Sequence, residues 1–179
     1  LLADTAARVA ATLRNPVGGR RPDAGEPVWD VLDGAGFVAM RAEPGAGGAT
    51  VQEVALCVEA FGRALAQGPL VGPLLATELL AVSAAEGSEV ASRMLEAVAA
   101  GSLRATVALD EGLSLPVGPG TEPVAFDALG CTAAVGLAGF EGGAVPVVWE
   151  IGSPRGGVDL TRRLARVAPG APEPLGPAL

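Results

Sequence analysis

Few side chains in this sequence could carry out chemistry. The 179 residues include no His, no Lys and no Tyr, and all 12 basic residues are Arg. A Ser-His-Asp triad, a zinc-binding HExxH helix, a P-loop and a Schiff-base lysine each require one of these missing types, so the sequence excludes them. Carboxylates, hydroxyls and two thiols remain for proton transfer or nucleophilic attack. We therefore expect difficult chemistry to belong to a cofactor.

The two thiols, Cys57 and Cys131, lie far apart in the sequence. They form no CxxC pair, and there is no His to complete a zinc site of common spacing. The sequence therefore predicts two buried free cysteines and no metal site.

Two adjacent carboxylates, Asp110 and Glu111, follow a Val-rich stretch and precede Gly112. At such a strand end, backbone amides and short polar side chains often meet a ligand. Neighbouring residues of a strand point to opposite faces, so these two do not form an acid and base pair facing one substrate. A ligand-contacting loop and a solvated strand end both remain open.

A glycine-rich stretch, GAGGAT at 45–50, precedes a helical pattern. In dinucleotide-binding folds such a stretch lets a pyrophosphate approach a helix N-terminus. This one lacks the last Gly of GxGxxG and follows no convincing strand, so a plain turn is the favoured interpretation.

An arginine-rich stretch, VDLTRRLARV at 158–167, stands out in a chain of net charge -8. It could be a phosphate clamp, a nucleic-acid contact or a strand that happens to be basic. The acidic chain repels nucleic acid and anionic lipid, which argues against the second of these. In strand geometry Arg162 and Arg166 share one face, while Arg163 lies on the other. We expect mainly structural arginines, paired with carboxylates of the sheet or of a partner subunit.

The secondary structure that must position these residues is predicted to change from helices to strands along the chain. A 3.6-residue apolar period predicts helices at 3–13, 27–34, 51–67, 73–84 and 88–100, the third opened by a capping-box pattern of Thr50 and Glu53. Short Val-rich runs between Gly and Pro turns predict strands at 103–110, 122–126, 131–139, 144–151 and 160–167.

Helices followed by strands indicate an α+β fold, because a parallel sheet would require the two types to alternate. We expect an N-terminal all-helical domain at 1–101, a small antiparallel β domain at 102–168 and a Pro- and Gly-rich linker at 169–179. Core packing is the expected role of the large aromatic side chains Trp29, Phe61, Phe140 and Trp149.

The sequence also bears on where in the cell the protein lies. Nothing at the N-terminus has the order of a signal peptide, and charged residues interrupt the apolar runs well short of the roughly 20 residues of a membrane span. The sequence predicts a cytoplasmic protein with no membrane or nucleic-acid partner.

Three segments resemble the acyl-CoA dehydrogenase family, especially its actinobacterial members. They are VWDVLDGAGFVAMRAEPGAGGATVQEVALCVEAFGRALAQGPLVGPLLATELL (28–80), AAGSLRATVALDEG (99–112) and VDLTRRLARV (158–167). The resemblance implies a helical N-terminal region followed by a β domain against which FAD lies. It also implies oxidation of an acyl-CoA at Cα and Cβ, with FAD as hydride acceptor and electron transfer flavoprotein as the protein that reoxidises the flavin.

The family's flavin-contacting strand and loop is similar to VALDEG at 107–112, with Asp110 in place of Thr and Gly112 in place of Pro. The resemblance implies that FAD is contacted by Leu109, Asp110, Glu111 and Ser114.

The family's C-terminal helical bundle, which supplies the catalytic Glu, would begin about where the chain ends. The resemblance therefore implies no catalytic residue within these 179 residues. It implies either an incomplete enzyme chain of lipid metabolism or a catalytically degenerate subunit of a heteromeric dehydrogenase. A non-enzymatic acyl-CoA-binding module is the third alternative. A homo- or hetero-oligomer with another dehydrogenase subunit is expected for the first two.

Overall fold

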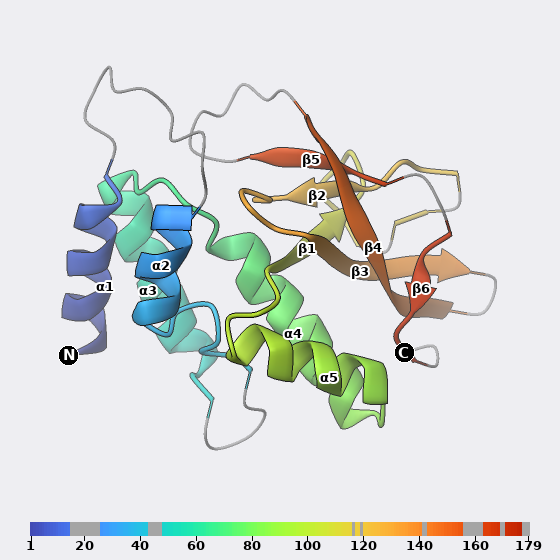
Figure 1. The fold of residues 1–179 in the computed structure, drawn as a ribbon, viewed down its shortest axis with the longest axis horizontal. Coiled ribbons are helices and arrows are strands. Elements are labelled where there is room, and N and C mark those ends of the chain that lie inside the picture. The colour runs from blue at the N-terminus through green and yellow to red at the C-terminus, as the bar shows by residue number, and fades with distance from the viewer. Residues whose placement is uncertain are drawn as a thin grey trace.

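The computed structural model describes residues 1–14, 26–42, 48–115, 117–118, 120–140, 143–155, 163–168 and 171–176. Within them, helices occupy the N-terminal part of the chain and strands occupy the C-terminal part, as the colours of Figure 1 show. The prediction of a mixed fold in which helices precede strands is confirmed.

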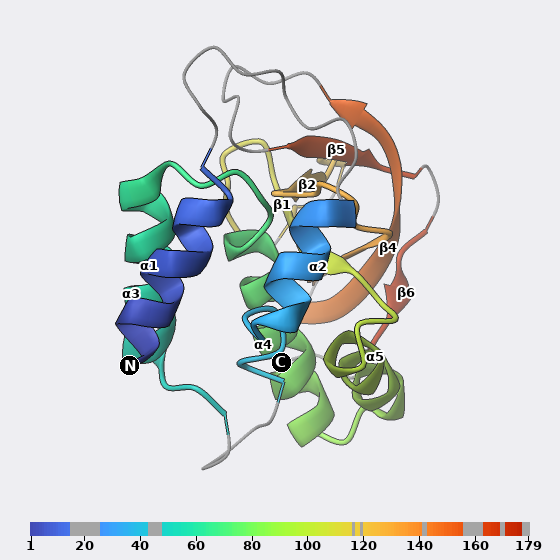
Figure 2. The same cartoon turned by 60° about the vertical axis from the view of Figure 1, so that its left-hand side comes forward.

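The described helices begin and end close to their expected positions. They are α1 (Leu2–Thr12), α2 (Glu26–Gly34), α3 (Val51–Ala64), α4 (Val71–Ala85) and α5 (Glu89–Ala99). α1 packs against α3 and α4 packs against α5, and the two pairs lie side by side in both views (Figure 1, Figure 2).

The start of α3 is fixed by the predicted capping box. The backbone N–H of Glu53 donates to Thr50 Oγ1 at 3.3 Å, and the backbone N–H of Thr50 donates to Glu53 Oε2 at 2.7 Å. The helix ends earlier than expected, at Ala64, because Leu65 adopts a left-handed conformation with φ 50°. The Gly68-Pro69 pair therefore lies in the connection to α4.

Six strands follow the helices in the described residues. They are β1 (Ala105–Leu109), β2 (Val124–Phe126), β3 (Ala133–Phe140), β4 (Gly143–Arg155), β5 (Leu164–Val167) and β6 (Glu173–Pro174). Neighbouring strands follow the order β3-β1-β2-β5-β4-β6, and an additional pairing of β3 with β4 closes the first five into a barrel. β6 pairs with β4 beside the barrel.

The expectation of a purely antiparallel β part is wrong for one pairing. β1 and β3 run parallel, with Ala105 opposite Ala133 and Val107 opposite Val135, whereas the other pairings between these six strands are antiparallel. β2 occupies one edge of β1, so the chain crosses through 127–132 and places β3 along the other edge, in the direction of β1. Turn residues between short strands predict hairpins and do not encode such a crossover.

Helix α4 connects the helical part to the barrel. It packs against β1 and β3 as well as α5. More than half of its residues are buried, namely Gly72, Pro73, Leu74, Ala76, Thr77, Leu80, Ala81 and Ser83. A helix with apolar residues on most of its circumference is typical of a protein interior, which is where α4 lies.

Two apolar clusters form the core. The larger one combines the helices with residues of β1 and β3, and it contains Trp29 and Phe61. The smaller one lies in the barrel and contains Trp149, whose exposed fraction is 7%. The predicted burial of these three aromatic residues is confirmed, and the side chain of Phe140 lies outside the described residues.

The C-terminal stretches differ in part from their expected form. β5 begins at Leu164, and residues 158–162 of the arginine-rich stretch lie outside the described residues. A short strand, β6, forms within the tail for which the sequence predicts no strand. Next to it, the backbone N–H of Leu175 donates to Pro146 O at 2.8 Å, and the Leu175 side chain is buried.

Candidate functional site

The loop that follows β1 is closed by its own hydrogen bonds. The backbone N–H of Ser114 donates to Asp110 Oδ1 at 2.8 Å, and the backbone N–H of Asp110 donates to Ser114 O at 3.1 Å. The backbone N–H of Leu113 donates to Asp110 O at 3.0 Å. Leu113 adopts a left-handed conformation, with φ 59°, and 59% of its surface is exposed. The loop is therefore a compact turn that presents an apolar side chain to solvent.

The structure brings together two of the four residues expected to contact FAD and places the other two beside them. Asp110 and Ser114 are joined by the hydrogen bonds of the turn, and Glu111 lies exposed between them. Leu109 is the last residue of β1 and is buried opposite Val124 of β2. Glu111 and Ser114 are thus the exposed residues of this set.

β1 holds this loop on a rigid base. All five of its residues are buried. The Thr106 hydroxyl donates to Phe126 O, which ties β1 to the end of β2. A site on a strand end is more precisely positioned than one on a free loop.

The N-terminus of α4 is held at the same barrel by a buried carboxylate. Asp127 Oδ2 accepts the backbone N–H groups of Leu70 at 2.8 Å, Val71 at 3.0 Å and Gly72 at 3.4 Å. A carboxylate at a helix N-terminus satisfies free N–H groups and is favoured by the helix dipole. Asp127 is 1% exposed, so it acts as a structural cap and does not meet substrate from solvent.

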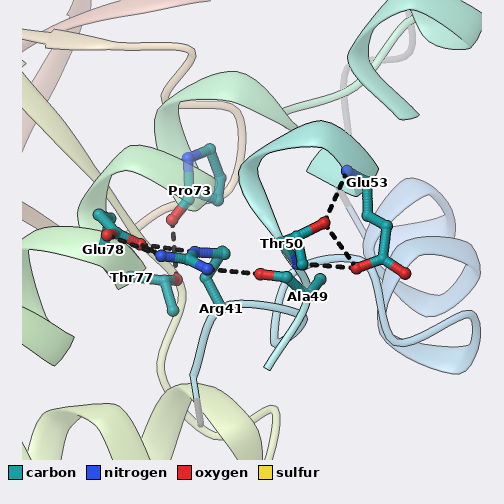
Figure 3. A network of polar contacts seen from close by, with 7 residues as sticks. All are labelled: Arg41, Ala49, Thr50, Glu53, Pro73, Thr77 and Glu78. Carbon is teal, nitrogen blue, oxygen red and sulfur yellow. Dashed lines mark hydrogen bonds and ion pairs between the residues drawn. The ribbon is translucent and has the colours of Figure 1, made fainter. Parts of the chain in front are cut away.

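A bidentate ion pair fixes the segment that precedes α3. Arg41 Nε donates to Glu78 Oε2 at 2.6 Å and Arg41 Nη2 donates to Glu78 Oε1 at 2.8 Å, while Arg41 Nη1 donates to Ala49 O (Figure 3). The hydrogen bond with Glu78 raises the pKa of the guanidinium. Glu78 lies on α4, and Ala49 directly precedes the capping box of Thr50 and Glu53. The ion pair therefore connects α4 to the start of α3 (Figure 3).

The two thiols are buried and free, as the sequence predicts. Burial raises the pKa of both Cys57 and Cys131, because desolvation disfavours the thiolate, and a nearby carboxylate adds to the effect in each case. Neither thiol is therefore an activated nucleophile at neutral pH. The described residues also contain no group of three or more Cys, Asp or Glu that could hold a metal ion.

Two cavities lie against Trp149. One, of about 430 Å³, is lined by Met94, Leu103 and Glu173 among others. The other, of about 480 Å³, is lined by residues of β4 and β5 and of the segment just before β2, including Arg166. Both volumes fall in the range of small-molecule sites.

Sequence reasoning missed several of these contacts. Asp127 caps a helix whose own preceding residue, Leu70, has no capping side chain, and this missing signal is the one hint that a distant residue must cap it. The residues of the cavity at Arg166 come from β4, from β5 with the residue after it, and from the segment just before β2, so no local pattern groups them. Residues 45–47 of the glycine-rich stretch at 45–50 lie outside the described residues.

No protein-family model, curated protein or solved structure matches the chain. Within the described residues, no helix combines the length and apolar character needed to cross a membrane. The family resemblance of the sequence therefore remains a proposal.

Proposed function

We propose that the chain is the N-terminal helical and middle β part of a FAD-dependent acyl-CoA dehydrogenase. The observation that carries this proposal is the turn from Asp110 to Ser114, which closes directly after β1 at the segment that resembles the family's flavin-contacting loop. The order of helices before a β part supports the proposal as well. The finer fold assignment is part of it, with a helical domain at 1–101 and a β domain at 102–168.

The loop carries a polar side chain that can form hydrogen bonds with a flavin. Exposed Ser114 offers a hydroxyl that both donates and accepts hydrogen bonds. The ring N–H and the ribityl hydroxyls of a flavin are suitable partners for it. The amides of Asp110, Leu113 and Ser114 are already used within the turn, so the proposed contacts rest on side chains more than on these amides.

The chain itself binds and orients in this proposal and carries no catalytic residue. Bound FAD would supply the acceptor for the hydride that leaves Cβ of the acyl thioester. The resemblance assigns the carboxylate that takes the α proton to a part of the enzyme outside these 179 residues. Electron transfer flavoprotein is the proposed electron acceptor and the acyl-CoA is the proposed substrate.

A second candidate is a degenerate subunit that supports the active chain of a heteromeric dehydrogenase. Exposed apolar side chains favour this alternative, since α4 leaves Leu75 46% and Val82 41% exposed on a helix that is otherwise largely buried. Exposed apolar surface of this kind is typical of contact with another domain or subunit. Co-expression with an active dehydrogenase chain and co-purification would favour this candidate.

The direct test is a titration of the purified chain with FAD, in which the polarisation of flavin fluorescence reports binding. We expect saturable binding that weakens several-fold in Ser114→Ala. Ser102→Ala is the matched control, because Ser102 is also exposed but bonds only to Ala97 O at the end of α5. Absence of any FAD binding, by the chain alone and with a dehydrogenase partner, contradicts the flavoprotein assignment.

A further inference from the structure

The C-terminal segment 171–176, named the latch below, contains β6 and lies along one edge of β4 (Figure 1). Val147 and Val148 of β4 pair with β3 on one edge of the strand and with the latch on the other. The backbone N–H of Leu175 donates to Pro146 O at 2.8 Å. Three consecutive residues of β4 therefore hold the latch through its backbone.

The latch has one buried anchor, the side chain of Leu175. This side chain is 2% exposed and belongs to the larger apolar cluster, which contains the helices. The backbone carbonyl of Leu175 accepts the hydroxyl of Ser88, and Ser88 Oγ in turn accepts the backbone N–H of Ala91 at 3.0 Å. One hydroxyl thus caps the start of α5 and holds the latch, so the latch connects β4 to α5.

The other residues of the latch add little to its docking. Ala171, Glu173 and Pro174 are exposed, and Pro172 and Gly176 are only partly buried. Neither proline has an N–H that could donate to β4. The burial of one leucine side chain therefore opposes the entropy cost of ordering six residues. A segment with so few buried contacts opens locally while the rest of the fold stays intact.

A change in the strand register separates the latch from β5. β5 pairs with β4 at Ile151 opposite Val167, and the latch pairs with β4 at Val148 opposite Glu173. Between these two pairs β4 has two residues, whereas five sequence positions lie between Val167 and Glu173. Regular pairing cannot continue across unequal lengths of chain. The latch is therefore a contact of its own, and its docking does not follow from the pairing of β5.

The latch also forms one wall of the cavity of about 430 Å³ beside Trp149. It contributes Ala171 and Glu173 to the lining, whereas α5 contributes Met94 and β4 contributes Val148 and Trp149. Trp149 is 7% exposed when the latch is in place. Removal of the latch would take away this wall and expose apolar surface of β4 to water.

We propose that the latch undocks as a unit from an otherwise intact fold, and that its undocking opens the cavity beside Trp149 to solvent. Leu175 then leaves the apolar cluster, the Ser88 hydroxyl remains as the cap of α5, and the edge of β4 at Val147 and Val148 becomes free. This device does not depend on the proposed function, because its contacts lie within the described residues of this chain.

The first test needs no substitution. Hydrogen exchange of the native chain, followed by NMR, compares the backbone N–H of Leu175 with that of Leu80, which lies within α4 and is 0% exposed. We expect Leu175 to be about a hundredfold less protected than Leu80, because the latch opens without global unfolding. Low urea should accelerate the exchange of Leu80 and leave that of Leu175 almost unchanged. Equal protection and equal urea dependence would show that the latch opens only when the whole protein unfolds, which would overturn the proposal.

Quenching of tryptophan fluorescence by acrylamide tests the opening of the cavity. Trp29 is 0% exposed and lies among the helices, so added quenching reports Trp149. Leu175→Ala should raise the quenching constant about twofold, because the latch loses its anchor. Leu56→Ala is the matched control, since Leu56 lies exposed on α3, and it should leave the constant unchanged. An unchanged constant in Leu175→Ala, with Leu80 still protected from exchange, would contradict the proposed opening.

Ser88→Asp releases the latch while it keeps the helix cap, and it serves as the second variant if Leu175→Ala fails to fold. The carboxylate still accepts the N–H of Ala91, but it has no O–H to donate to Leu175 O. We expect the exchange of the Leu175 N–H to accelerate about tenfold, as for the loss of one hydrogen bond, while that of Leu80 stays unchanged. Thr50→Asp makes the comparable change at the start of α3 and should alter neither rate. Equal acceleration of Leu175 in the two variants, or none in Ser88→Asp, would count against the latch.

Discussion

The Asp127 carboxylate accepts the backbone N–H of Leu70 at 2.8 Å, although 57 positions separate the two residues. The same oxygen accepts the N–H groups of the next two residues, so one side chain from the barrel caps α4. Asp127 itself has φ 58°, a conformation that Asp tolerates better than most residues. The helical part and the barrel are therefore joined by a buried polar contact as well as by apolar packing.

Replacing Asp127 with Ala should lower the free energy of unfolding by about 3 kcal/mol, because buried N–H groups of α4 lose their acceptor. Asp127→Asn retains an acceptor oxygen and tolerates the left-handed backbone, so we expect a loss nearer 1 kcal/mol. Asp127→Gly relieves the backbone and removes the acceptor, which separates the two effects. Urea unfolding measures all three, and a Gly variant as stable as wild type would exclude a capping role.

A second prediction concerns the close approach of α4 to the barrel at Gly72. A Cβ placed there would meet Thr106 Oγ1, Phe126 O and, at 2.9 Å, Asp127 Cβ. Phe126 O is a backbone atom of the barrel and Asp127 Cβ belongs to the buried cap, so neither can move aside. Gly72→Ala should therefore lower the free energy of unfolding by about 2–3 kcal/mol.

Gly62→Ala is the matched control for this change. Gly62 lies within α3, and a Cβ there would meet nothing within 4 Å. Ala is favoured over Gly inside a helix, so this variant should gain about 0.5–1 kcal/mol. Opposite signs of the two changes in thermal unfolding are the expected result. A neutral Gly72→Ala would mean that α4 can shift away from β1.

Features carried by neighbouring residues could be predicted from the sequence. The capping box of Thr50 and Glu53 needs only two side chains three positions apart, and both of its hydrogen bonds are present. The change from helices to strands near Ser102 also follows from local period and turn residues. By contrast, the end of α3 was misplaced, because Leu65 takes a left-handed conformation that leucine rarely adopts.

Features that join distant segments could not be predicted. The parallel pairing of β1 with β3 depends on which edge of β1 is free after β2 has paired. The cap of α4 by Asp127 depends on the same barrel geometry. For the candidate site, a local pattern predicts the strand end at Asp110, whereas the cavity at Arg166 combines β4, β5 and the segment before β2 and could be found only in the structure.

The left-handed conformation of Leu65 gives a third prediction. A non-glycine residue in this conformation is strained by about 1–2 kcal/mol, and 67% of the Leu65 surface is exposed, so little burial is lost on removal of its side chain. Leu65→Gly should therefore stabilise the protein by about 0.5–1 kcal/mol, as glycine does after many helix ends. Leu56→Gly, at an exposed position inside α3, should instead destabilise it by about 1 kcal/mol. Two shifts of the same sign in chemical unfolding would contradict this account of Leu65.

The capping box gives a pH prediction through Glu53. The backbone N–H of Thr50, followed by its hydroxyl, lowers the pKa of Glu53 from its ordinary value of 4.5, because both donate to the carboxylate. A lowered pKa in the folded protein means that the contribution is fully present above the ordinary pKa and is lost as pH falls through the lowered one. Glu53→Gln keeps an acceptor but does not titrate.

The melting temperatures of wild type and Glu53→Gln are compared from pH 7 down to pH 3. Their difference isolates the contribution of Glu53, because the other carboxylates titrate in both proteins. We expect wild type to be the more stable at pH 7 and the difference to shrink below about pH 4.5, where the unfolded chain begins to bind the proton. Thr50→Val removes the hydroxyl but leaves the backbone N–H, so it should weaken the pH dependence without abolishing it. A difference that stays constant down to pH 3 would show that the Glu53 carboxylate has the same pKa in the folded and unfolded chains, and that its bond to the Thr50 backbone is absent in solution.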